Sequence, residues 1–460
     1  MVELNEKIWI KYAQGIQSWS GKDGKPDPNA IYFIASAVNK GPAAGSFVPI
    51  ENMNNVLFEQ CDALIADTSP VYNPGNAGSY FDCVDKYISA VKIKGNEDQG
   101  LKQQLKDVKE ELKNVKKEFR EMQKEETKNW EEDPHSGAKA KVAFGTWVSS
   151  NAPDLLQLQN EVQILAGKQA QIQLQIGGEG AAKLSNQQNT LIQAGTRATY
   201  VPGVTMQSTL DQISPADYEK YYKATQDGTV GKLPPLQVTG AFNRPAYSIE
   251  PTFETTMDQW ARVPLDAKDE FEYSIKSEEL TETSWTKLGH KNGGVSFGWG
   301  FLRIQVGGSK EWKESEIVKK SGSFEIQLSA QRAGLFNVNP GIWNVKRFRQ
   351  VYPNVDVDTG MAKNAVQPTQ LFCASRVKIK VKFTGEMEKE FDKVVEDTKG
   401  GKAGFSFLGF KIGAGGGTRD RETTHTSKLQ KEDGWYKMEP TLVAGGCSML
   451  AVIGNKLNEQ

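Results

Sequence analysis

Two series of apolar residues between positions 101 and 176 follow the spacing of a coiled coil and mirror each other. The first series is Leu101, Leu105, Val108, Leu112, Val115, Phe119 and Met122, with steps alternating between four and three. The second is Leu155, Leu158, Val162, Leu165, Gln169, Ile172 and Ile176, with steps alternating between three and four. A chain that turns back on itself needs this reversed order. The pattern therefore predicts an antiparallel coiled-coil helical hairpin.

The two series pair in layers when the chain folds back. Leu112 then faces Leu165, and the polar Gln169 faces Val108, where it would fix the register of the helices. The first helix carries lysines and glutamates of alternating sign outside its seam, while the second carries mostly glutamines. Each helix covers about 22 residues, so the arm is about 33 Å long.

The segment between the two helices contains three aromatic residues, Trp130, Phe144 and Trp147. Asn151-Ala152-Pro153-Asp154 at its end is a typical start of a helix. Aromatic side chains at the tip of an arm can contact a membrane or a protein partner. They can equally form a local cap on the coiled coil. Both interpretations stay open from the sequence.

The regions beside the hairpin have different characters. Residues 1–95 contain short apolar runs between Pro and Gly breaks, and residues 56–65 and 81–91 have helical spacing, which indicates a mainly helical segment. Residues 96–198 hold the hairpin and a following helix that ends near Gly195. Residues 199–235 form a connector.

Residues 236–460 are expected to form a β-rich domain. Strands are predicted at 236–242, 247–255, 270–276, 294–306, 323–330, 375–384, 405–414 and 441–453, and a helix at 386–397. Residues 377–383 alternate apolar and basic side chains, as an antiparallel strand with one solvated face does. The predicted fold class is α+β, with an antiparallel coiled-coil helical hairpin attached to a C-terminal antiparallel β-sandwich-like body.

Two glycine-rich stretches inside this domain resemble each other. Residues 294–309 and 404–418 both read Gly-x-Ser-Phe, continue to Gly-Phe followed by a basic residue and Ile, and end in consecutive glycines. A duplicated β-hairpin or chance explains the likeness equally well. Such strands suit a membrane-inserting hairpin, a tightly packed core, or an edge that pairs with another copy. The interaction candidates in these stretches are Phe297, Trp299, Phe301, Phe405, Phe407 and Phe410.

Charge and composition argue against several classes of partner. Lys plus Arg number 56 and Asp plus Glu 57, so no net charge attracts nucleic acid or an anionic membrane at long range. No apolar run of transmembrane length and no signal-peptide pattern is present, which predicts a cytoplasmic protein or, alternatively, one released without a signal peptide.

The four cysteines, Cys61, Cys83, Cys373 and Cys447, are widely spaced and lack the CxxC and His pairs of a zinc site. Isolated thiols are the simplest interpretation. The alternative is one or two disulfides, within the chain or between copies. Cys447 is an interaction candidate because the glycine-rich segment 444–448 around it favours accessibility.

Motifs that carry chemistry are weak in this chain. Residues 294–298 match GxSxG, but a glycine-rich strand follows where a nucleophile elbow needs a helix. Residues 354–360 resemble a calcium loop that lacks the glycine at its sixth place and has Ala365 instead of glutamate. The basic run 346–349 has aromatic neighbours and can hold a phosphate or sulfate, or be a solvated edge. We expect no catalytic residue, cofactor or metal.

These observations predict a non-enzymatic structural or interaction protein that self-associates through its helical arm and β-rich body into a homo-oligomer. The alternative is a membrane-active, pore-forming-like protein that inserts its glycine-rich amphipathic β-hairpins. The combination of a helical and a β-hairpin resembles pore-forming toxins in architecture only, without motif identity. Neither a nucleic-acid partner nor a small-molecule substrate is indicated.

Overall fold

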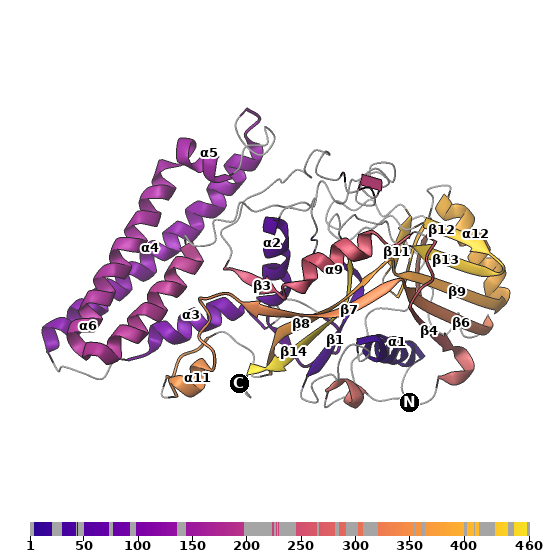
Figure 1. Ribbon diagram of the computed structural model, residues 1–460, viewed down its shortest axis with the longest axis horizontal. Helices are drawn as coiled ribbons and strands as arrows, with labels where there is room; N and C mark the ends of the chain where they lie inside the picture. The colour runs from indigo at the N-terminus through magenta and orange to yellow at the C-terminus, as the bar shows by residue number, and fades with distance from the viewer. Residues whose placement is uncertain are drawn as a thin grey trace.

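The computed structural model has a mixed α+β fold, with packed helices and antiparallel sheets, which confirms the predicted class at that level (Figure 1). The structure describes residues 4–20, 30–42, 44, 50–72, 77–92, 98–135, 144–196, 223–224, 227, 229, 245–264, 266–280, 285–290, 302–306, 321–353, 355–359, 364–399, 403–408, 410–413, 428–439 and 446–457. The predicted strand at 236–242 lies outside these residues.

A helical arm extends from one side of the molecule in Figure 1. It contains α4 (Gln99–Glu132), α5 (Phe144–Asn151) and α6 (Pro153–Thr196). The side chain of Asp98 caps α4 by accepting a hydrogen bond from the Leu101 amide. The middle of the predicted seam is buried in one cluster that contains Leu112, Val115, Val162 and Leu165. Both predicted arm helices are therefore present and pack against each other.

The long helical run α6 doubles back on itself. Gln173 donates a hydrogen bond from Nε2 to Oε1 of Gln188 over 2.6 Å. In one straight helix these residues would lie about 22 Å apart. We call residues 153–176 the forward half and residues 181–196 the return half. The return half is the additional helix that the sequence predicts, and it makes the arm a bundle of three helical rods.

The central sheet of the body has the strand order β1-β14-β8-β7-β3, with the short β2 paired to β8. Its strands are β1 (Ile31–Lys40), β2 (Ile65–Ala66), β3 (Tyr247–Ile249), β7 (Arg332–Pro340), β8 (Ala365–Ser375) and β14 (Ser448–Lys456). All of their ladder pairings are antiparallel. Because β1 pairs with β14, segments from opposite ends of the chain lie side by side.

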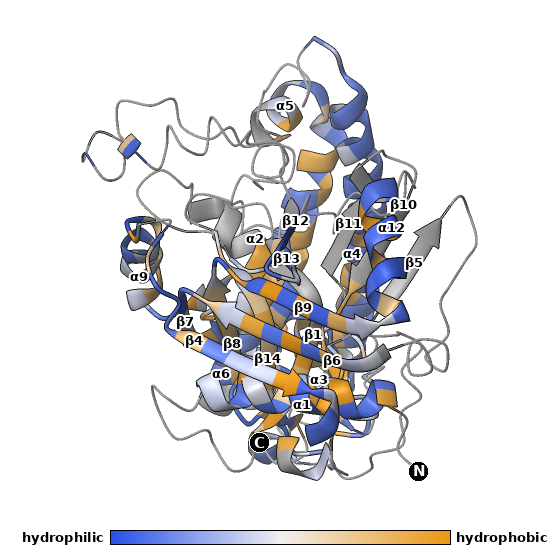
Figure 2. Cartoon of the chain, turned by 90° about the vertical axis from the view of Figure 1, so that its right-hand side faces the viewer, coloured by the Kyte–Doolittle hydropathy of each residue, from blue (hydrophilic) through white to orange (hydrophobic). Residues whose placement is uncertain are grey.

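A second sheet has the order β12-β13-β9-β6-β4. Its strands are β4 (Phe271–Lys276), β6 (Ser321–Ala330), β9 (Lys378–Gly385), β12 (Lys428–Glu432) and β13 (Trp435–Glu439). The residues of β9 alternate between apolar and polar along the strand in Figure 2, as the sequence predicts. Asp433 and Gly434 join β12 to β13 with φ angles of 52° and 77°, the left-handed conformation that a tight hairpin turn uses.

The central and second sheets are connected by a pair of antiparallel strands that bends and continues from one sheet into the other. The β6–β9 pair of the second sheet continues as the β7–β8 pair of the central sheet, with the corner at Gln331 and Arg376. The Arg376 guanidinium donates to the Gln331 side-chain oxygen over 2.5 Å and to the Val263 carbonyl over 2.7 Å. These hydrogen bonds fix the corner, because they satisfy buried groups on both strands.

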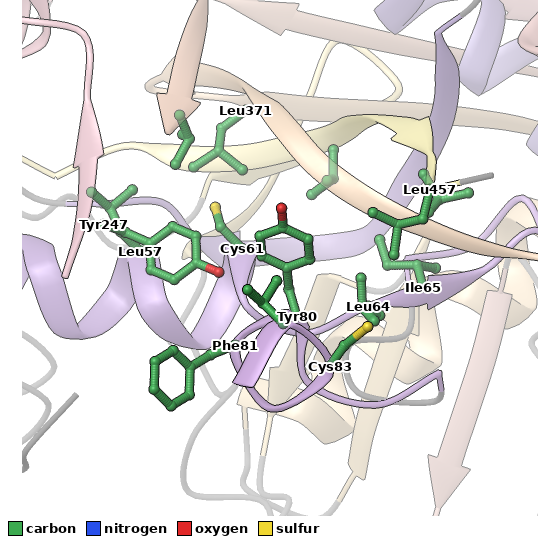
Figure 3. Close-up of a cluster of buried hydrophobic side chains, with 14 of the residues drawn as sticks. Leu57, Cys61, Leu64, Ile65, Tyr80, Phe81, Cys83, Tyr247, Leu371 and Leu457 are labelled. Carbon is green, nitrogen blue, oxygen red and sulfur yellow. The ribbon is translucent and has the colours of Figure 1, made fainter. Parts of the chain in front are cut away.

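Helices cover both faces of the central sheet. On one side, α1 (Leu4–Ser20) packs in a core shared with the second sheet. On the other side, α2 (Ile50–Cys61), α3 (Tyr80–Ala90) and α9 (Thr252–Ala261) build a separate core, part of which Figure 3 shows. Shorter helices are η3 (Ser277–Glu279), η4 (Trp285–Leu288) and α11 (Phe348–Val351). Segments before and after the arm thus form one body.

The two similar glycine-rich stretches meet in a third sheet, β11-β10-β5. It contains β5 (Leu302–Val306), β10 (Ala403–Phe407) and β11 (Phe410–Gly413). In the antiparallel ladder Phe405 is opposite Ile304 on β5 and Ile412 on β11. The helix α12 (Glu386–Lys399), predicted at 386–397, packs against both this sheet and the second sheet. Its buried Phe391 contacts the rings of Phe383 and Tyr436 in the second sheet.

The prediction of a strand over residues 247–255 is wrong in its second part. The strand β3 ends at Ile249, and α9 begins at Thr252. Phe253, Met257 and Trp260 recur at helical spacing and are all buried, so burying this stripe needs a helix. The prediction also missed β1, β7, all of β8 except Ser375, and the β12–β13 hairpin.

Candidate functional site

A buried network of side-chain amides joins the two halves of α6. Oε1 of Gln188 accepts hydrogen bonds from Nε2 of Gln169 and of Gln173, each over 2.6 Å. Ser185 donates to the Gln173 oxygen over 2.7 Å. Gln173 is fully buried, although the sequence pattern had placed it outside the seam. Its burial is possible because each of these polar groups has a partner.

The same network attaches the arm to the body. Nε2 of Gln188 donates to the backbone carbonyl of Ile88, at the end of α3, over 2.9 Å. Leu184 and Leu191 of the return half belong to the core of the body. Along α3, Lys116 of α4 forms an ion pair with Asp85 over 2.8 Å. The return half and α4 therefore face the body.

The three aromatic candidates at the tip come together as the sequence suggests. Trp130 and Phe144 have ring centroids 5.7 Å apart, and Phe144 and Trp147 stack at 6.2 Å. Their exposed fractions are only 2%, 3% and 6%. The Trp147 ring N–H donates to the Asp133 carboxylate over 2.9 Å. This geometry is that of a local cap, which closes the end of the arm around α5.

The forward half of α6 presents a second heptad series on its outward face. We call this series the outer seam; it consists of Gln157, Asn160, Ile164, Gly167, Gln171 and Leu174, with steps of three and four. Ile164 is 59% exposed and Leu174 is 48% exposed, which is unusual for side chains of this size. A Cβ atom added at Gly167 would meet nothing within 4 Å. The outer seam is open to a partner.

The outer seam differs in charge from the rest of the arm surface. Its six residues are uncharged, and the flanking positions Glu161 and Lys168 carry opposite signs. The exposed surface of α4, in contrast, is dense in lysine and glutamate, with ion pairs such as Lys117–Glu121. A neutral stripe with exposed apolar residues costs less to dehydrate than such a charged surface. It is therefore the better interface of the two.

A second feature is an open cleft of about 1300 Å³ where β3, β7 and β8 approach the loop before α11. Its lining carries a row of hydrogen bonds from β8 through β7 to Glu250, the residue that follows β3. Gln370 donates to the Asn337 side-chain oxygen over 2.8 Å, and Asn337 donates to the Glu250 carboxylate over 2.9 Å. Lys346 and Arg347 line the same cleft. The basic run singled out in the sequence thus lies beside a polar, amide-lined surface that can bind hydrogen-bonding or anionic groups.

The loop between β7 and α11 forms one wall of the cleft and holds an exposed isoleucine. Ile342 is 97% exposed, whereas the adjacent Trp343 is 2% exposed. The Trp343 ring N–H donates to the Ala246 carbonyl over 2.8 Å, and the Gly341 amide donates to the same carbonyl over 2.7 Å. The exposed residue therefore stands on a firmly anchored loop.

Asp62, the residue after α2, has a buried carboxylate that forms hydrogen bonds with α3 and β3. It accepts hydrogen bonds from the Phe81 amide over 2.8 Å, from the Tyr247 hydroxyl over 2.9 Å, and from the Ser79 hydroxyl. Ser79 is also the N-cap of α3. Burial raises the pKa of Asp62, an effect that these three hydrogen bonds oppose. The carboxylate thus links α3 to β3.

The remaining candidates are spread over the molecule. Phe297, Trp299 and Phe301 lie outside the described residues, as does the GxSxG sequence. Phe405 lies on β10 and Phe410 on β11, and their side chains are outside the described part of the structure. Phe407 on β10 is buried.

Cys447 is half-buried, and its thiol donates to the Pro42 carbonyl over 3.3 Å. Burial, followed by a hydrogen bond with Cys447, raises the pKa of the Cys373 thiol. All four cysteines are free thiols in the structure. Cys447 is thus held next to Cys373 inside the body.

Sequence reasoning missed the outer seam and the cleft. The seam has the 3-4 spacing of a coiled coil, but four of its residues are Gln, Asn or Gly, so it does not appear in an apolar pattern.

Within the described residues there is no cluster of His, Cys, Asp and Glu suited to a metal ion, and none of the described helices is long and apolar enough to cross a membrane. Searches for relatives found no matching protein-family model, curated protein or solved structure.

Proposed function

We propose that this chain is a non-enzymatic interaction protein, an antiparallel coiled-coil arm on a β-sandwich-like body, and that it self-associates through the arm. The observation that carries the proposal is the exposed outer seam, in which Ile164 and Leu174 face solvent along a neutral helix surface. Burying apolar surface between copies is the main favourable term in association. A net charge of −1 adds little long-range repulsion between copies.

The position of the outer seam supports contact between whole molecules. The body lies against the return half and α4, through Leu184, Leu191 and the Lys116–Asp85 ion pair. The forward half buries the opposite side of its surface, with Val162 and Leu165 inside the arm. A second copy can therefore approach the outer seam without meeting the body.

The test is the molar mass of the full chain over a concentration series, measured by light scattering after size exclusion. The wild-type mass should rise from 50.8 kDa toward twice that value. The double change Ile164→Asp and Leu174→Asp should hold the protein at the monomer mass, because it places charges in the contact. Gln104→Asp with Asn114→Asp, two exposed positions at the same spacing on α4, is the matched control and should associate as the wild type does. A wild type that stays monomeric at every concentration contradicts the proposal.

A second candidate function is membrane insertion of the glycine-rich strands. The observation that favours it is the pairing of β5 with β10, which places the two similar stretches in one sheet. Membrane-inserting strands enter a bilayer as a paired sheet, and β5 is already paired with the β10–β11 hairpin. Release of an encapsulated dye from liposomes of neutral and anionic composition is the expected result. Intact liposomes across both compositions and a range of pH would argue against it.

A further inference from the structure

The outer seam has a pattern that is complementary to itself in the reverse direction. Its steps of three, four, three, four and three residues read the same from either end. A helix that meets an antiparallel copy of itself therefore places every seam residue opposite another seam residue. We propose that two copies of this chain join through their forward halves as an antiparallel, two-fold symmetric helix pair.

The two-fold axis would lie between Ile164 and Gly167. Ile164 of each copy then packs over Gly167 of the other, a large side chain against an open position where an added Cβ meets nothing within 4 Å. Asn160 pairs with Gln171, so that amide faces amide, and Gln157 covers Leu174. The six layers span about 26 Å of helix, most of the forward half.

Charged residues beside the seam support the same orientation. Glu161 and Lys168 flank the seam on the same edge, one heptad apart. In an antiparallel pair the residues of this edge face their counterparts from the other copy, so Glu161 meets Lys168 twice, once on each side of the axis. In a parallel pair the two residues would instead face Gln163 and other uncharged positions. Among the described residues neither Glu161 nor Lys168 has an ion pair within its own chain.

The antiparallel arrangement also keeps the bodies apart. Each body contacts its own return half and α4, on the side of the arm that is away from the outer seam. The two bodies would then lie on opposite outer sides of the helix pair. Because the interface is isologous, it closes at two copies and does not propagate into a filament.

This inference rests on the proposed self-association, and charge reversal tests it separately. Glu161→Lys and Lys168→Glu, each alone, should weaken dimerisation of the full chain on the order of tenfold, because two like-charge contacts replace two ion pairs. An equimolar mixture of the two single variants should recover wild-type affinity, since both contacts in the mixed dimer are again between opposite charges. Sedimentation velocity of each protein and of the mixture measures this.

A second variant probes the layer at the axis. Gly167→Asp leaves the monomer fold unstrained, because the position is open, but it should weaken dimerisation at least tenfold, since it places a charge against Ile164 of the other copy. The helical signal in circular dichroism and the melting temperature of the monomer should not fall below the wild-type values, because glycine is the weaker helix former. A wild type that dimerises while both charge variants bind unchanged, or while their mixture fails to recover, overturns the antiparallel register. A wild type that remains monomeric overturns the proposed function itself.

Discussion

Replacing Asp62 with alanine is expected to lower the free energy of unfolding by about 3–5 kcal/mol. The change leaves the Phe81 amide and the Tyr247 hydroxyl without their acceptor in a buried site, and each unpaired group costs about 1–3 kcal/mol. Ser79 loses a partner at the same helix start. Urea unfolding followed by circular dichroism measures the loss.

Asp62→Asn is the matched control, because an amide oxygen keeps an acceptor for Phe81 and Tyr247. It should cost less than half as much as alanine. Asp266→Ala, at an exposed position, should change stability by less than about 0.5 kcal/mol. An alanine variant as stable as this surface control would mean that Asp62 does not hold α3 and β3 together.

The raised pKa of Asp62 adds a pH dependence with a definite sign. The folded state keeps a proton on Asp62 at pH values where the unfolded chain, with an ordinary pKa of about 3.9, has lost it. Stability from this group is therefore present at low pH and lost as pH rises through the folded pKa, at up to about 1.4 kcal/mol per pH unit. The asparagine variant should lack this slope. Parallel pH curves for the wild type and Asp62→Asn would contradict it.

Replacing Gln188 with leucine should open the joint between the arm and the body. Gln169 and Gln173 then lose the acceptor that both share, and the Ile88 carbonyl loses a donor. Two buried amide groups without a partner correspond to about 2–5 kcal/mol of lost stability. Hydrogen exchange of the return half and of the last turn of α3 should rise together, because one side chain connects them.

Gln193→Leu is the control for this change, since it lies exposed on the same return half. It should leave both stability and exchange near the wild-type values. If Gln188→Leu increases exchange in the return half but not in α3, the hydrogen bond to Ile88 contributes little to stability. The packing of Leu184 and Leu191 against the body would then attach the arm by itself.

The arm could be predicted from the sequence because its signal is local. A heptad spacing of apolar residues needs no knowledge of distant segments, and the layers around Leu112 and Val115 follow it. The amide network could not be predicted in the same way. Gln173 and Gln188 are polar in any sequence profile, and only the return of α6 brings them together. Their burial depends on partners, not on hydropathy.

The body was harder to predict for a similar reason. Most of β8 is buried on both faces, so it lacks the alternation that marks a half-exposed strand, and it contains Gln367, Pro368 and Gln370. The bent pair of strands also continues through Gln331 and Arg376, where sequence offers no clear break. The β12–β13 hairpin carried a usable signal in Asp433-Gly434, which the charged residues around it obscured.

The pairing of β1 with β14 has a consequence for how the protein is made. Residues 31–34 cannot find their partners at 451–454 until the chain as far as residue 454 has left the ribosome. At about 5–20 residues per second, β1 waits roughly 20–80 s for the strand that it pairs with. The arm, whose two internal apolar clusters lie within residues 112–192, can fold during that time. The N-terminal strand of the central sheet is therefore paired later than the arm is formed.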